Sequence, residues 1–160
     1  MRPRIALVTG ANGEMGHLLL PALRERGYEL VVVDLQPVAE EHRARCRASV
    51  AGSVVDSALM TSLFREHPPD AVFHLAALLS TRSEFTPVTA HEVNVDGTLR
   101  LLEFAQHEGE SHGRPVTFVY PSSIAAYGLP SLEAKMKARR VREDEWNTPR
   151  TMYGCNKLYC

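Results

Sequence analysis

Short apolar segments alternate along the chain with longer amphipathic ones, and this alternation limits the folds open to it. The apolar segments predict strands over residues 4–9, 29–34, 47–52, 71–77 and 115–121. Between them, helical periodicity predicts helices over 15–26, from an Asp56 N-cap to about residue 67, and over 87–108. In the first helix, Leu18, Leu19, Leu20 and Leu23 are expected to face inward. Strands separated by helices form βαβ units with right-handed crossovers, so we predict an α/β fold with a doubly wound parallel sheet and helices on both faces.

Composition narrows the classes of partner. The chain has 160 residues, 44% of them hydrophobic and 23% charged, with a formal net charge of −1. That balance provides no basic face for nucleic acid, and no apolar run approaches the ~20 residues of a membrane span. The apolar stretch near the N-terminus is too short for a secretory signal. We therefore expect one cytoplasmic domain that binds a small molecule and neither nucleic acid nor a membrane.

Cysteine and histidine spacing supports neither a disulfide framework nor a metal site. Cys46, Cys155 and Cys160 form no CxxC pair, and the histidines show neither HxxxH nor HExxH spacing. The cysteines are expected to be reduced thiols, with Cys155 a small core residue rather than a nucleophile. His74 lies in the fourth predicted strand and is expected to pack there, with a ligand role as the alternative.

A glycine-rich turn, TGANGEMG, follows the first predicted strand and opens the first predicted helix. Glycine lets a backbone turn tightly and approach a pyrophosphate, whose charge is met by the N–H groups and dipole of the helix N-terminus. Together with the βαβ frame, this turn predicts a Rossmann-type dinucleotide site. The plainer alternative is three turn glycines and a chance aspartate. The residues expected to contact the cofactor here are Gly10, Asn12, Gly13, Glu14, Met15, Gly16 and Asp34.

Asp34 also bears on which dinucleotide is bound. It ends the second predicted strand, where a carboxylate can accept hydrogen bonds from both adenosine ribose hydroxyls. A 2′-phosphate would face that fixed negative charge, and Leu35 and Gln36 offer no cation to offset it. NAD is therefore favoured over NADP, although Arg43 and Arg45 in the following loop leave NADP open.

A hydroxyl, a phenol and an ammonium make up the predicted catalytic group. Ser122 and Ser123 follow the fifth predicted strand, and Tyr153 and Lys157 lie four residues apart, so on a helix they share one face. Lowering a phenol pKa from about 10 by three units takes about 4 kcal/mol, and an ammonium ~4 Å away supplies about that much at an effective dielectric near 20. Tyr153 can then act as a base and Ser123 can hold the substrate oxygen. Many helices carry YxxxK by chance, and a non-catalytic dinucleotide sensor would need none of these residues.

These motifs together resemble an extended short-chain dehydrogenase/reductase. The likeness rests on TGxxGxxG, Asp34, HLAA at 74–77, NVDGT at 94–98, the serine pair and Tyr153 with Lys157. It implies that Ala76 and Ala77 pass beneath the cofactor, that Leu75 also contacts it and that Asn94 helps to position it. It also implies that Ser123 is the catalytic serine, with Ser122 as the alternative, and that Tyr153 and Lys157 contact the cofactor as well.

Within that superfamily, HLAALLS followed by Glu84, PSSIAAYG and TPRTMYG resemble the short-chain type of L-threonine 3-dehydrogenase. This resemblance implies oxidation of the L-threonine 3-hydroxyl to 2-amino-3-oxobutanoate, with Ser80, Ser122, Ser123 and Tyr153 at the substrate. The alternative is a nucleotide-sugar epimerase or dehydratase. In many of those an aromatic residue stands where this chain has Glu14, and a proline usually stands where it has Met152.

The charged stretch at residues 131–145 bears on that choice. It is expected to be a solvated helix or flap, and the alternative is that its cations meet an anionic ligand. Those cations are Lys135, Lys137, Arg139, Arg140 and Arg142.

Residues 1–160 are expected to be the NAD-binding half of a longer chain, with a sixth strand and a substrate domain beyond Cys160. The resemblance also makes a homodimer possible through the 87–108 and Tyr153 helices.

Overall fold

A computed structural model describes residues 2–160, which form two compact units. Of these residues, the first unit comprises 2–77 and Asp96–Pro121, and the second comprises Leu78–Val95 and Ser122–Cys160. The chain therefore leaves the first unit after Ala77, returns at Asp96 and leaves again after Pro121.

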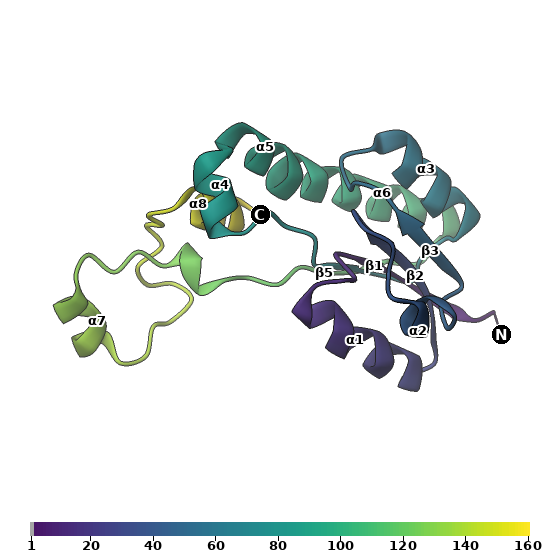
Figure 1. The fold of residues 1–160 in the computed structure, drawn as a ribbon, viewed down its shortest axis with the longest axis horizontal. Coiled ribbons are helices and arrows are strands. Elements are labelled where there is room, and N and C mark those ends of the chain that lie inside the picture. The colour runs from purple at the N-terminus through teal and green to yellow at the C-terminus, as the bar shows by residue number, and fades with distance from the viewer. Residues whose placement is uncertain (1) are drawn as a thin grey trace. The chain divides into compact units, whose positions relative to one another are not determined.

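A five-stranded parallel sheet forms the centre of the first unit (Figure 1). Its strands are β1 (Arg4–Thr9), β2 (Tyr28–Asp34), β3 (Ala48–Ala51), β4 (Ala71–His74) and β5 (Thr117–Val119), in the order β3-β2-β1-β4-β5. Thr9 pairs in register with Val33 on one side and with His74 on the other. The carboxyl ends of β1, β2 and β4 therefore meet at one edge of the sheet, where doubly wound folds bind their ligands.

Helices cover both faces of this sheet. Figure 1 shows α1 (Glu14–Glu25) and α2 (Glu40–Arg43) on one face, and α3 (Ser57–Glu66) and α6 (Gly97–His112) on the other. Leu20 and Leu23 of α1 are buried against Val8 and Val32 of the sheet. The predicted α/β class with helices on both faces is confirmed.

The prediction that Leu18 faces inward is wrong, because this side chain is 80% exposed. Each helical residue turns the chain by about 100°. The buried positions of α1 are Gly16, Leu20 and Leu23, and Leu18 lies on the opposite side of the helix from them. Leu19 is half-buried and packs at the margin of the core.

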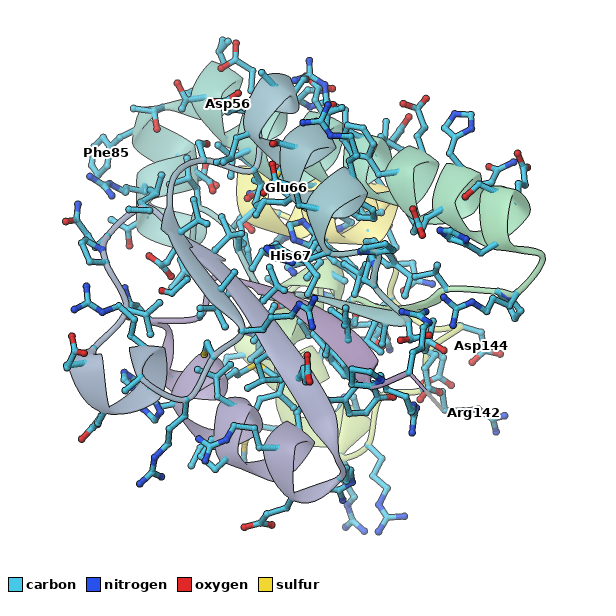
Figure 2. All side chains as sticks on the ribbon, turned by 90° about the vertical axis from the view of Figure 1, so that its right-hand side faces the viewer. Asp56, Glu66, His67, Phe85, Arg142 and Asp144 are labelled. Atoms are coloured by element: carbon cyan, nitrogen blue, oxygen red, sulfur yellow. The ribbon has the colours of Figure 1, made fainter. Side chains whose placement is uncertain are left out.

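Several predicted boundaries differ from the structure. β4 ends at His74 rather than at residue 77, and β5 covers three residues rather than the predicted 115–121. Asp56 does cap α3, since its carboxylate accepts from the Leu59 N–H at 3.0 Å. Figure 2 shows Asp56 at the beginning of this helix and Glu66 at its other end.

The helix predicted over 87–108 is three elements in succession. α5 (Pro87–His91) is followed by a π-helical turn, η1 (Glu92–Asp96), and then by α6. The helix runs past Gly109 and ends at Gly113, whose φ of 66° is the left-handed conformation typical of a helix C-terminus. The wider π turn interrupts the regular period that the sequence suggests.

The second unit is built of short helices. They are α4 (Ser80–Phe85), α5, η2 (a 3₁₀ turn, Ile124–Ala126), α7 (Leu132–Ala138) and α8 (Met152–Tyr159). α7 lies in the charged stretch and buries no residue, as expected of a solvated helix. α4 was not predicted from the sequence.

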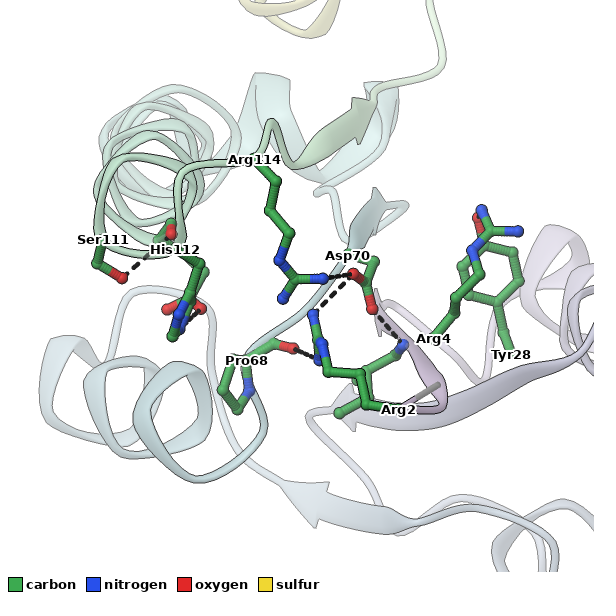
Figure 3. A network of polar contacts seen from close by, with 10 residues as sticks. Arg2, Arg4, Tyr28, Pro68, Asp70, Ser111, His112 and Arg114 are labelled. Carbon is green, nitrogen blue, oxygen red and sulfur yellow. Dashed lines mark hydrogen bonds and ion pairs between the residues drawn. The ribbon is translucent and has the colours of Figure 1, made fainter.

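Asp70 directly precedes β4 and is the centre of a network of polar contacts (Figure 3). Its carboxylate accepts from the Arg2 and Arg114 guanidiniums at 2.7 and 2.6 Å and from the Ile5 N–H at 2.8 Å. One carboxylate therefore joins the start of β1 to the segment after α6.

No helix within residues 2–160 is both long enough and apolar enough to cross a membrane.

Candidate active site

The glycine turn is shaped by close approach of two backbone segments. Gly10 has φ 71°, and its N–H donates to the Val33 carbonyl at 2.9 Å. A Cβ at this position would lie 2.6 Å from the Ala76 nitrogen and 2.8 Å from the Leu75 carbonyl carbon. The Leu75 N–H also donates to the Thr9 carbonyl at 3.0 Å. The structure thus brings together the turn and the segment predicted to lie beneath the cofactor.

The N-terminus of α1 is open to an anion. Gly13 is its N-cap and makes no side-chain cap, and the first intrahelical bond runs from the His17 N–H to the Gly13 carbonyl at 3.1 Å. The N–H groups of Glu14, Met15 and Gly16 therefore have no partner inside the helix. A Cβ on Gly16 would collide with the Ala11 carbonyl, so the turn holds its shape only with glycine there. This cradle fits a pyrophosphate by its free donors and helix dipole.

Asp34 lies beside the cradle at the end of β2. Its carboxylate accepts from the Asn12 N–H at 2.9 Å and from the Gln36 N–H at 3.3 Å, one bond to each oxygen. Each oxygen of a carboxylate has two acceptor sites, so both remain able to accept from a ribose hydroxyl. Arg43, which could have met a 2′-phosphate, is paired with Glu40.

His74 packs as the sequence suggests. It is fully buried, with Nδ1 2.7 Å from the Thr9 hydroxyl and Nε2 3.0 Å from the Thr98 hydroxyl. Its ring stacks on Tyr120 with centroids 5.7 Å apart. Both ring nitrogens are occupied by protein hydroxyls, so His74 fixes the end of β4 from within the core.

In the second unit, the backbone of α8 packs closely against the turn that follows Ser123, and Gly154 makes this approach possible. The Ser123 hydroxyl oxygen caps η2 by accepting from the Ala125 N–H at 3.2 Å, which leaves its proton free to be donated. A Cβ on Gly154 would collide with the Ala125 carbonyl, so the backbone of α8 rests directly on η2. Ser122 is exposed. Gly154 was missed from the sequence, where its place inside YxxxK gives no sign of this contact.

Tyr153 and Lys157 share one face of α8, as their spacing predicts. The Lys157 nitrogen lies 5.7 Å from the centroid of the Tyr153 ring, within the range of a cation–π contact. Lys157 is only 6% exposed. Burial lowers the pKa of Lys157 below its ordinary value, and the charge at Cys160 partly opposes this effect. The second unit thus holds a buried cation against the ring of the predicted base.

Asn94 is buried in the π turn, and its side-chain amide forms hydrogen bonds with the backbone of Leu78. Its oxygen accepts from the Leu78 N–H at 2.8 Å, and its nitrogen donates to the Leu78 carbonyl at 3.0 Å and toward Asn156 at 3.4 Å. This arrangement fixes the loop after β4. A direct role for Asn94 at the cofactor stays a prediction, as does a substrate role for Ser80, which begins α4 and is exposed.

The expectation that Cys155 is a core residue is wrong, because its side chain is exposed. Two helical residues correspond to about 200°, so Cys155 faces away from Tyr153. All three cysteines are free thiols. No group of three or more metal-binding side chains occurs in the part of the chain that the structure describes.

The chain matches the model of the NAD dependent epimerase/dehydratase family over residues 6–160, and it belongs to this family. NAD is accordingly the cofactor.

The chain is 34% identical over 131 residues to a UDP-glucose 4-epimerase from Rhizobium leguminosarum bv. trifolii, covering 81% of this chain and 38% of that protein. Two solved structures are also similar. One is L-threonine dehydrogenase from Clostridium difficile, with 28% identity, a TM-score of 0.79, and coverage of 99% of this chain and 47% of that one. The other is UDP-glucose 4-epimerase from Thermus thermophilus in complex with NAD, with 29% identity, a TM-score of 0.78, and coverage of 97% and 48%. The chain therefore spans about half the length of these structures.

Proposed function

We propose that the protein transfers a hydride between NAD and a secondary alcohol carbon, with Tyr153 as the base. The observation that carries this proposal is the arrangement of α8, in which a buried lysine lies against the tyrosine ring and Gly154 rests on the Ser123 turn. A non-catalytic dinucleotide sensor has no use for a buried ammonium, whose desolvation is unfavourable.

The residues of the second unit divide the work of alcohol oxidation. Ser123 donates its free hydroxyl proton to the substrate oxygen and holds it in line. The Tyr153 phenolate oxygen, stabilised by the nearby Lys157 ammonium, takes the proton of the substrate hydroxyl and becomes a neutral phenol. NAD, when bound, supplies the acceptor for the hydride that leaves the same carbon. Gly10, Gly13, Gly16 and Asp34 would hold its pyrophosphate and adenosine ribose.

L-threonine is the substrate that we propose, oxidised at its 3-hydroxyl to 2-amino-3-oxobutanoate. Support comes from HLAALLS, PSSIAAYG and TPRTMYG, and from the similarity to the Clostridium difficile L-threonine dehydrogenase over nearly the whole chain. A small substrate needs few contacts, and Ser80, Ser122 and Ser123 are the hydroxyls that we assign to it. A homodimer through the 87–108 and Tyr153 helices is part of the same proposal.

Nucleotide-sugar epimerisation is the second candidate. It is favoured by the Rhizobium UDP-glucose 4-epimerase, which is 34% identical. The exposed cations of the charged stretch offer a second argument, because a diphosphate needs positive charge. Part of that charge is already paired, since Lys137 bonds to Glu133 at 2.7 Å and Arg142 lies 3.6 Å from Asp144.

NADH production by the full-length protein decides between these candidates. With NAD and L-threonine we expect NADH to accumulate, and with UDP-glucose we expect no UDP-galactose. Tyr153→Phe should lower turnover at least about 100-fold and leave the NAD dissociation constant nearly unchanged. Tyr159→Phe is the matched control, because this tyrosine lies on the same helix and is 69% exposed. UDP-sugar interconversion without NADH would select the epimerase, and an unaffected rate in Tyr153→Phe would restore the sensor.

A further inference from the structure

We infer that Glu84 is a positioning residue that sets the start of the Tyr153 helix. Its carboxylate oxygen accepts a hydrogen bond from the Met152 N–H at 2.6 Å, across 68 residues of sequence. Met152 is the first residue of α8 and directly precedes Tyr153. This inference rests on the proposed function, because it assigns Glu84 a part in aligning the base.

Glu84 is held in place by its own helix. Its neighbour Ser83 is fully buried, and the Ser83 hydroxyl donates to the Leu78 carbonyl at 2.8 Å. The same carbonyl accepts from the buried Asn94 amide at 3.0 Å, so the base of α4 is tied to the π turn. Although the Glu84 side chain is itself exposed, a shift of its backbone would strain these partly buried bonds.

Two caps from different parts of the chain therefore define the beginning of α8. Thr151 accepts from the Gly154 N–H at 3.0 Å, and Glu84 accepts from the Met152 N–H. Tyr153 is the residue between the two capped positions. The Glu84 bond is short, as expected of a charge-assisted bond, and its negative charge lies at the positive end of the helix dipole. Because Gly154 also rests on the Ser123 turn, the two caps fix where the phenol stands relative to the serine hydroxyl.

This arrangement predicts a catalytic defect that differs from a loss of folding. Glu84→Ala removes the acceptor, so α8 begins with a free N–H and Tyr153 gains freedom. Misplacement of a reacting group by about 1 Å can cost up to about 100-fold in rate. We expect kcat to fall at least about tenfold, equivalent to about 1.4 kcal/mol. The NAD dissociation constant and KM should stay within about twofold of wild type, because Glu84 is assigned no contact with either ligand.

The rescue variant and control separate positioning from general stability. Glu84→Gln keeps an oxygen acceptor at the same reach, so it should retain at least about half of the wild-type kcat. Glu143→Ala removes an exposed carboxylate elsewhere in the same unit, in the charged stretch, and should leave kcat unchanged. Hydrogen exchange of the peptide spanning residues 149–156 supplies a readout without activity. It should show faster exchange at the start of α8 in Glu84→Ala and restored protection in Glu84→Gln.

Two results would overturn the inference. One is an unchanged kcat in Glu84→Ala despite faster exchange, which would leave Glu84 as a helix cap with no effect on Tyr153. The other is an equal loss of kcat, NAD binding and thermal stability in both Glu84 variants, which would make its role structural only. Inactivity of the wild type toward both L-threonine and UDP-glucose would instead refute the proposed function. The exchange experiment would still decide whether Glu84 fixes the start of α8.

Discussion

Replacing Gly10 by alanine tests whether the close approach of the glycine turn to residues 75–76 holds the first unit together. Gly10 has φ 71°, a conformation that costs an L-residue about 1–2 kcal/mol. The added Cβ would also lie 2.6 Å from the Ala76 nitrogen and 2.8 Å from the Ala76 Cα, both of them backbone atoms that cannot rotate away. Such overpacking costs a further 1–3 kcal/mol or so. We expect a total loss of about 2–5 kcal/mol, a large part of the ~5–15 kcal/mol that stabilises a typical domain.

Two other glycines separate the contributions. Gly27 has φ 80° with no atom within 4 Å of an added Cβ, so Gly27→Ala should lose only the conformational part, about 1–2 kcal/mol. Gly13 has an ordinary φ of −70°, and its Cβ would meet only the Gly10 carbonyl at 3.3 Å. Gly13→Ala should therefore change stability by about 1 kcal/mol or less and weaken NAD binding at least about tenfold, since the methyl group would stand in the cradle. Urea unfolding measures the stabilities and titration with NAD the affinities. Equal losses in Gly10→Ala and Gly27→Ala would refute the reasoning, because the close approach would then contribute nothing.

Three further changes test the charged groups. In the wild type, NAD should bind at least about tenfold tighter than NADP, a difference of about 1.4 kcal/mol. Asp34→Asn should reduce the ratio of the two dissociation constants. Equal dissociation constants in the wild type would contradict the role assigned to Asp34. Asp70→Asn weakens the bonds from Arg2 and Arg114, and because both guanidiniums are partly exposed the loss in urea unfolding should be only about 1–2 kcal/mol and smaller in high salt. Burial lowers the pKa of Lys157, so in the alkaline range the unfolded chain binds more protons than the folded one, and stability should rise as the pH climbs from that lowered pKa toward the ordinary value of 10.5. Unfolding measured across this range should show that rise in the wild type and lose it in Lys157→Met, and an identical slope in both would show that Lys157 is not its source.

Most of the first unit can be predicted from the sequence, because short local sequence patterns determine its strands and its glycine turn. Each strand is an apolar run, and the glycine turn and Asp34 lie at strand ends, where parallel pairing carries them to one edge of the sheet. The errors there concern details that depend on neighbours. Leu18 belongs to a run of three leucines that periodicity alone cannot orient. The π turn at Glu92–Asp96, most of which lies in the second unit, likewise has no simple sequence signature.

The second unit follows from its sequence only in part, because its stabilising bonds join segments far apart in the chain. The spacing of Tyr153 and Lys157 fixes their common face, since that depends on helix geometry alone. Nothing local predicts that Glu84 reaches Met152, or that Gly154 is needed because Ala125 lies against it. A six-residue helix such as α4 is too short to be stable by its own propensity, so it depends on contacts with other segments. These include the hydrogen bonds that Ser83 and Asn94 donate to the Leu78 carbonyl and the bond between Glu84 and Met152. Local sequence motifs therefore identify the predicted catalytic residues, whereas the alignment of these residues depends on polar residues far away in the sequence. Substitution of such a distant residue should lower kcat more than it lowers the stability of the fold.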